Sequence, residues 1–326
     1  MTSVTSLVVG GGGFLGTAVA DALRRAGDQV VVPSVPWREP DRAARVLGDA
    51  VHALRSGSTP WRLVWCAGTG IVASGDDAFE TERLLLDAAL SDGSPARAPG
   101  TVFFASSAGA TYAGSTAPDD EPFDERTVPR PLAPYGTSRL VAEDRFRSWT
   151  AATGARLLIG RIANLYGPGA NLRKPQGLVS QLALAHLERR PSTVYVPFDT
   201  TRDYLYIDDA AEMVLEALRA VQTTPAGTTV VKVFASQQGR TITEVVEAVT
   251  AAIGAPLDVR TGDHDSAAAQ ARRLRFRSVV LPEVDDRVQL SFDEGVRRTV
   301  AAVRAAVPAR SEPPRSVPTP DDRESA

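Results

Sequence analysis

The stretch VTSLVVGGGGFLG, residues 4–16, decides the fold of this chain. Its apolar run through Val8 and Val9 is typical of a buried first strand of a parallel sheet, and four glycines follow at once. The glycines fit both G-x-G-x-x-G and G-x-x-G-x-x-G. An amphipathic helix is expected from Phe14 to Ala26, and Gly27 ends it.

Strand, glycine turn and helix in this order predict a dinucleotide site. Glycine lets the backbone approach a pyrophosphate, and the helix N-terminus faces that anion with free N–H groups and the positive end of its dipole. A glycine-rich turn without a ligand is the alternative, and the context favours the dinucleotide. The predicted binding residues of the turn are Gly10, Gly11, Gly13, Phe14, Leu15 and Gly16.

The composition is that of a globular protein. The chain has 326 residues, a formal net charge of -3 and 43% hydrophobic residues, enough for a sizeable core. The charge gives no reason to expect nucleic acid or a membrane as partner, and the sequence has no membrane-length apolar span and no signal peptide. We therefore expect a cytoplasmic protein. Its single cysteine, Cys66, and three scattered histidines predict no metal site.

Strands and helices alternate along the first half, which predicts an α/β fold with a Rossmann-type, doubly wound parallel sheet. Residues 1–170 form mainly the nucleotide-binding domain. Residues 171–307 mix the last sheet strands with a smaller C-terminal substrate-binding lobe. The proline-rich tail, residues 308–326, should be disordered. The expected strands are 29–32, 62–67, 101–105, 156–161, 194–196 and 230–234, and the later helices 41–55, 79–90, 137–149, 177–188, 210–221, 242–253 and 292–305.

A tyrosine and a cation lie one helical turn apart. Tyr135 and Arg139 are at positions i and i+4, so the phenol and the guanidinium share a helix face. A fixed positive charge lowers a phenol's pKa and makes it a better acid–base group. Ser106 and Ser107 end the strand FFASS, where a hydroxyl can hold a substrate oxygen. Together they predict a hydride-transfer site, with Ser107 preferred over Ser106 as the orienting group.

With these motifs, residues 4–306 resemble an extended short-chain dehydrogenase/reductase of the nucleotide-sugar epimerase/dehydratase group. The resemblance implies that Tyr135 is the acid–base group, that Arg139 binds the nicotinamide ribose, and that Asn164 and Arg202 hold a substrate diphosphate. The matching segments, in order, are Gly10–Gly16, Cys66-Ala67-Gly68, Ser106-Ser107, Tyr135 with its i+4 cation, residues 161–169 (RIANLYGPG), 202–209 (RDYLYIDD) and 291–295 (SFDEG).

The chain departs from that family at several positions. Arg139 stands where the family has Lys, and Ala108 where it has Ser or Thr. Ala108 and Gly109 also replace the acidic pair of dehydratases, which argues against dehydration. The helix before the Ser strand lacks the family's Asn. These changes keep a non-catalytic sensor or scaffold open as an alternative.

The cofactor is predicted from the end of the second strand. NAD sites place Asp or Glu there for the ribose 2′-hydroxyl, whereas this chain has VPSVPWR at residues 32–38. Ser34 and Arg38 can take a 2′-phosphate, so NADP(H) is favoured and NAD(H) stays possible. Arg38 as a solvated loop residue is the alternative. Ala67 and Gly68 complete the predicted cofactor site.

The predicted function is reduction of a keto group on a nucleotide-linked sugar. A nucleotide-sugar epimerase with retained NAD is the second possibility. Lys174 and Arg277 are weaker candidates for a substrate phosphate, since a solvated surface explains them too. A homodimer is expected through the helices 79–90 and 137–149.

Overall fold

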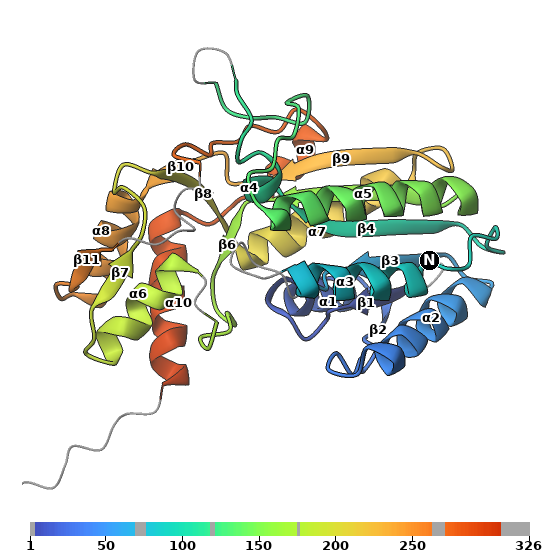
Figure 1. Ribbon diagram of the computed structural model, residues 1–326, viewed down its shortest axis with the longest axis horizontal. Coiled ribbons are helices and arrows are strands. Elements are labelled where there is room, and N and C mark those ends of the chain that lie inside the picture. Colours follow the sequence, from blue (N-terminus) through green and yellow to red (C-terminus); the bar gives the residue numbers. More distant parts are fainter. Residues whose placement is uncertain (1–3, 69–75, 118–120, 175–176, 263–270, 308–326) are drawn as a thin grey trace, which may run out of the picture.

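A computed structural model describes residues 4–68, 76–117, 121–174, 177–262 and 271–307 (Figure 1). The fold is α/β, as the sequence predicts, and a layered domain lies beside a smaller lobe. Within the described ranges, none of the helices has the length and apolar character that crossing a membrane requires. The predicted disordered tail, 308–326, lies outside the described residues.

Six parallel strands form the main sheet, in the order β2-β1-β3-β4-β5-β9. This is the doubly wound arrangement, with the chain crossing back at β1 and β3. Each strand was predicted, with boundaries that differ by one or two residues. The strands are β1 (Thr5–Val9), β2 (Gln29–Val31), β3 (Trp61–Trp65), β4 (Gly100–Ser107), β5 (Arg156–Ile162) and β9 (Thr229–Phe234).

Helices cover both faces of this sheet (Figure 1). One face packs on α1 (Phe14–Arg25) and α7 (Ile207–Gln222), and the other on α2 (Pro40–Ser56), α3 (Asp76–Ala89) and α5 (Pro134–Thr153). The core is therefore divided into two apolar layers, one on each side of the strands. The carboxyl ends of the strands are left open at one edge, where ligands of such sheets bind.

The smaller lobe packs three helices together: α6 (Leu178–Leu187), α8 (Ile242–Ile253) and α10 (Phe292–Ala306). The predicted strand 194–196 is found two residues earlier, and several short elements were not predicted. The lobe and its connections hold β6 (Asn164–Tyr166), β7 (Ser192–Val194), β8 (Thr201–Tyr206), β10 (Gly239–Thr241) and β11 (Val259–Thr261). Two short helices pack on the main domain instead, α4 (Ala108–Thr111) against α5 and α9 (Pro282–Asp285) against α7.

The small sheet β10-β8-β6 lies between the core of the main domain and the core of the lobe. Leu165 and Leu205 pack into the core of the main domain, whereas Tyr166, Tyr204 and Tyr206 pack into the core of the lobe. Alternating side chains of a strand point to opposite faces, so each strand serves both cores.

Candidate active site

The glycine turn is packed too closely for side chains. Gly10 has φ +83°, and a Cβ there would lie 2.6 Å from the backbone nitrogen of Ala67. Gly13 donates its N–H to the Gly10 carbonyl at 2.9 Å. A Cβ on Gly16 would lie 2.1 Å from that same carbonyl oxygen. Glycine is therefore required at positions 10 and 16, where the helix start lies directly against the turn.

The start of α1 fits an anion. Gly13 is the N-cap residue and gives no side-chain cap, which leaves N–H groups of the first turn for a ligand. A Cβ on Gly12 would meet nothing within 4 Å, so the turn faces open space. Leu15 is buried in the core, so it can contact a ligand only through its backbone. Phe14 is half-buried, so it can contact a ligand through its backbone or the edge of its ring. These residues fit a dinucleotide pyrophosphate.

The segments beside the turn are those expected for the rest of the cofactor. Gly68 follows Ala67 at the end of β3, and burial raises the pKa of the Cys66 thiol to about 12, which makes it inert. After β2, Val32 lies against Gly11, and Ser34 and Arg38 are both exposed in the loop that follows.

Tyr135 lies in the first turn of α5, close to the end of β4. Ser107 ends β4, caps α4 by accepting the N–H of Ala110 at 3.3 Å, and lies close enough to the Tyr135 phenol to lower its pKa. The structure therefore brings Tyr135 and Ser107 together.

Burial raises the pKa of Tyr135 above its ordinary value. The Arg139 charge lowers it, the charge of Glu82 raises it, and the Ser107 hydroxyl lowers it. Taken alone, the Arg139 charge favours the phenolate, as expected. The pKa of Tyr135 is nevertheless raised overall, because desolvation of the buried phenol is the largest effect.

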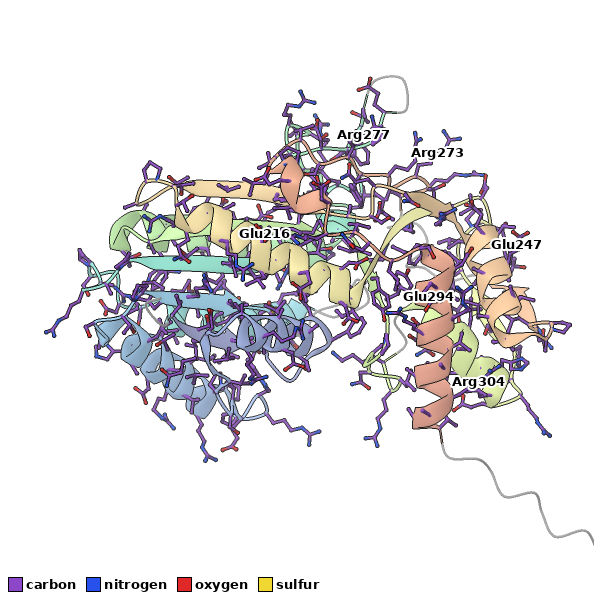
Figure 2. The ribbon with its side chains drawn as sticks, turned by 180° about the vertical axis from the view of Figure 1, so that it is seen from behind. Glu216, Glu247, Arg273, Arg277, Glu294 and Arg304 are labelled. Carbon is purple, nitrogen blue, oxygen red and sulfur yellow. The ribbon has the colours of Figure 1, made fainter. Side chains whose placement is uncertain are left out.

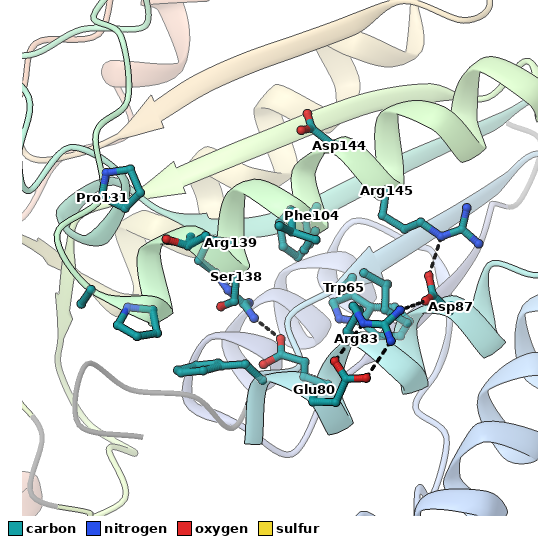
Figure 3. Close-up of a pocket in the computed structure, with 18 of the residues that line it drawn as sticks. Trp65, Glu80, Arg83, Asp87, Phe104, Pro131, Ser138, Arg139, Asp144 and Arg145 are labelled. Atoms are coloured by element: carbon teal, nitrogen blue, oxygen red, sulfur yellow. Dashed lines mark hydrogen bonds and ion pairs between the residues drawn. The ribbon is translucent and has the colours of Figure 1, made fainter. Parts of the chain in front are cut away.

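Arg139 is buried and turned toward α3 rather than toward solvent. Its guanidinium forms an ion pair with Glu82 and lies 5.7 Å from the ring centre of Phe104 (Figure 3). It also lies 5.4 Å from the ring centre of Tyr135. A Cβ on Gly68 would lie 3.2 Å from Arg139 Nη1. Arg139 therefore lies between Tyr135 and the predicted cofactor segment.

Ser106 points the other way. Successive residues of a strand face opposite sides, and Ser106 Oγ donates to Glu143 at 2.7 Å. Glu143 also accepts from Arg161 at 2.7 Å, and Arg161 donates to the Tyr112 hydroxyl at 2.7 Å. This buried network joins β4, α5, β5 and α4, and it holds Ser106 away from Tyr135.

The predicted substrate residues divide into two groups. The strand register puts Asn164, Arg202 and Arg240 on one face of the small sheet, with Arg202 and Arg240 directly opposite one another. Burial lowers the pKa of Arg202, which still stays charged. Lys174 is exposed in the loop before α6, and Arg277 is exposed on the outer rim, near Arg273 (Figure 2).

Sequence reasoning missed three residues near these sites: Glu82, Phe79 and Arg240. Phe79 and Glu82 are spaced i and i+3 on α3, so they share a face. The phenyl ring of Phe79 lies 6.2 Å from the ring of Tyr135. For Glu82, the sequence signal was Arg139, because a guanidinium that becomes buried requires a carboxylate nearby. Across the ranges that the structure describes, no three His, Cys, Asp or Glu side chains gather as a metal site would require.

Curated proteins match parts of this chain. The dTDP-L-rhamnose 4-epimerase of Burkholderia thailandensis is 36% identical over 95 residues, 29% of this chain and 26% of that protein. A putative UDP-glucose 4-epimerase of Methanocaldococcus jannaschii is 32% identical over 117 residues, 36% of this chain and 37% of that protein. The matches thus span less than two fifths of these relatives' length.

Solved structures match nearly the whole chain. The UDP-glucose 4-epimerase of Thermus thermophilus, in complex with NAD, gives a TM-score of 0.76 at 25% identity over 93% of this chain and 100% of that one. RMD of Pseudomonas aeruginosa, complexed with NADPH, gives 0.69 at 23% identity over 94% and 100%, a likeness of fold. The model of the NAD dependent epimerase/dehydratase family matches residues 6–231. With the Rossmann sheet and glycine turn described above, this match shows that the chain belongs to the NAD-dependent epimerase/dehydratase family, within the extended short-chain dehydrogenases/reductases.

Proposed function

We propose that this chain transfers hydride between a nicotinamide cofactor and a ring carbon of a nucleoside-diphosphate sugar. The main support is the position of Tyr135 beside Ser107 at the end of β4, the sheet edge that also bears the glycine turn. The cofactor, when bound, supplies or accepts the hydride. Tyr135 moves the proton at the sugar oxygen, and Ser107 hydrogen-bonds that oxygen.

Reduction of a keto group is the direction that this site favours. Burial raises the pKa of Tyr135, so the phenol is protonated and ready to donate to the developing alkoxide. Ala108 and Gly109 follow Ser107, where a dehydratase needs acidic groups, so loss of water is disfavoured.

Epimerisation is the second candidate, and the relatives favour it. Both curated relatives described above and the Thermus structure are named as 4-epimerases, and that structure holds NAD. An epimerase uses the same tyrosine, oxidises one carbon and reduces it again on retained NAD.

NADP(H) is the cofactor that the loop after β2 favours. No carboxylate stands between Val32 and Arg38 to bind a ribose 2′-hydroxyl, and Ser34 and Arg38, both accessible to solvent, suit a 2′-phosphate. NAD(H) remains the alternative, in line with the Thermus relative.

The sugar nucleotide would bind against the small sheet. Arg202 supplies a fork of donors for phosphate oxygens, and Asn164 lies on the same face. The Asn164 amide donates to the Asp203 carbonyl at 3.1 Å, which fixes its orientation. Arg240, paired in register with Arg202, adds a second positive charge. Lys174 and Arg277 are exposed, and we give them only a minor part in binding the substrate phosphates.

A homodimer through α3 and α5 is part of the proposal. A cleft of about 890 Å³ runs between these helices (Figure 3). Leu84 on α3 and Val141 on α5 are 53% and 49% exposed, so a partner could bury both of these apolar side chains.

The test begins with the cofactor. The purified protein is denatured, any released nucleotide is identified, and NADPH and NADH are titrated into the emptied protein. Nucleoside-diphosphate keto sugars are then supplied with NADPH. Retained NAD with sugar interconversion in the absence of added cofactor supports the epimerase, whereas stoichiometric NADPH oxidation supports the reductase. Failure to bind either nucleotide contradicts both.

The tyrosine is tested by Tyr135→Phe. We expect turnover to fall by about 10²- to 10⁴-fold, since one proton transfer is lost, while cofactor affinity is kept. Tyr195→Phe is the matched control, because Tyr195 is 44% exposed in the lobe. Unchanged turnover in Tyr135→Phe would refute the mechanism.

A further inference from the structure

Glu82 stands on α3 where its carboxylate reaches Arg139. Phe79, one turn earlier, packs its ring against Tyr135 at 6.2 Å. The same helix face therefore presents an apolar ring to the Tyr135 phenol and a negative charge to the Arg139 guanidinium. Two other acids of α3 are engaged elsewhere, since Glu80 and Asp87 pair with Arg83.

The Glu82–Arg139 pair is enclosed. The Arg139 side chain is 4% exposed and that of Glu82 is 16% exposed. Arg139 Nε and Glu82 Oε2 are buried without a hydrogen-bond partner in the described structure. A buried ion pair repays the cost of desolvation only when further hydrogen bonds satisfy its remaining polar atoms, so this pair is costly to the stability of the fold. The pair lies beside Gly68 of the predicted cofactor segment, where an added Cβ would be 3.2 Å from Arg139 Nη1 and 3.5 Å from Glu82 Oε1.

We propose that Glu82 is a positioning residue for Tyr135: it fixes the Arg139 guanidinium against α3 and offsets its positive charge beside the phenol. This inference rests on the proposed function of Tyr135. In this arrangement α3 supplies the carboxylate that pairs with Arg139, and this pairing is a reason why position 139 can hold an arginine.

The charges around the phenol support this role. Arg139 on α5 favours the phenolate, Glu82 on α3 opposes it, and the Ser107 hydroxyl at the end of β4 favours it. Without Glu82 the Arg139 charge would act unopposed, and the phenol would ionise at lower pH. In the reductive direction this would weaken the proton donor at alkaline pH, whereas in the oxidative direction it would improve the base at neutral pH.

The experiment compares Glu82→Gln with Glu80→Gln and Glu82→Asp. Tyrosinate absorbance is recorded against pH, and the Tyr135 transition is isolated by subtracting the curve of Tyr135→Phe. We expect the transition in Glu82→Gln to move about one pH unit to lower pH. Glu80→Gln should leave it in place, since Glu80 is exposed and pairs with Arg83. Glu82→Asp, which keeps the charge, should stay near the wild type.

A second variant covers the case in which Glu82→Gln does not fold. The double change Glu82→Gln with Arg139→Gln removes both buried charges, so the Tyr135 transition should return close to its wild-type position. An unchanged transition in Glu82→Gln, or a double variant shifted as far as the single one, overturns the inference. The titration needs no substrate, so loss of the proposed activity in the wild type would refute the function without affecting this result.

The pH profile of turnover supplies the second measurement. For keto-group reduction, the alkaline limb of kcat should move to lower pH in Glu82→Gln by the same amount as the tyrosinate transition, with KM for the sugar unchanged. A purely structural role of Glu82 would lower activity evenly at every pH, and that outcome overturns the inference.

Discussion

Replacing Gly16 by alanine tests how closely α1 must approach the glycine turn. The added Cβ would lie 2.1 Å from the Gly10 carbonyl oxygen, 2.7 Å from its carbon and 3.0 Å from the Gly11 Cα. All three atoms belong to the backbone, so no side chain can rotate away. The start of α1 must therefore move by about 1 Å before the contact is ordinary.

The expected cost is about 1–3 kcal/mol in the free energy of unfolding, the range found when a methyl group is forced into a packed site. Gly12→Ala is the control, because a Cβ there meets nothing within 4 Å. Both variants lose the same backbone flexibility in the unfolded state, so their difference isolates the steric contact.

Denaturant unfolding of the nucleotide-free protein measures this cost, and titration with the preferred nicotinamide nucleotide measures the effect on the site. A movement of about 1 Å at the pyrophosphate position should weaken cofactor binding by about ten-fold or more, since about 1.4 kcal/mol equals a factor of ten. If Gly16→Ala unfolds at the same denaturant concentration as Gly12→Ala, the close approach does not constrain the turn.

Three further changes have defined outcomes. Burial raises the pKa of Asp203 from 3.8 to about 6, so between these pH values the folded protein holds a proton that the unfolded chain releases. Stability should therefore fall as pH rises from about 4 to about 6, by about 3 kcal/mol from this one group, and Asp203→Asn should flatten the slope in denaturant curves. Arg38→Ala should weaken NADPH binding about ten-fold and leave NADH binding unchanged in a fluorescence titration, and equal losses for both would refute a 2′-phosphate contact. Leu84→Glu should shift the protein toward monomer in sedimentation velocity, whereas Val128→Glu, at a position 68% exposed and outside α3 and α5, should not.

The sheet could be predicted from the sequence because its signals are local. The glycine turn, the apolar strands and the amphipathic helices each depend on residues within one short window. Helix α8 begins and ends where predicted, since Thr241 and Glu244 form a capping box and Gly254 ends the helix in a left-handed conformation.

The second sheet could not be predicted in the same way. β6 and β10 are three residues long, too short for a pattern with a period of two to stand out. They form because β8 lies between them, and β8 comes from a distant part of the chain. Pairing of this kind is a tertiary property.

The candidate site was partly predictable for the same reason. Tyr135 and Arg139 are four residues apart, so their common face follows from helix geometry. Glu82 is 57 residues from Arg139, and only the packing of α3 on α5 brings them together. The direction of the Tyr135 pKa also depended on burial, which the sequence alone does not give.

The position of β6 and β8 between the two hydrophobic cores has a consequence for attempts to exchange segments between relatives. Because Leu205 serves one core and Tyr204 the other, cutting the chain at the end of the nucleotide-binding half would expose apolar surface on both pieces. The protein should then unfold as one cooperative unit, and neither piece should be stable by itself. A chimera built to change sugar specificity would have to exchange β6 and β8 together with the core residues that pack against them. Residues that recognise the sugar therefore cannot be exchanged separately from the core.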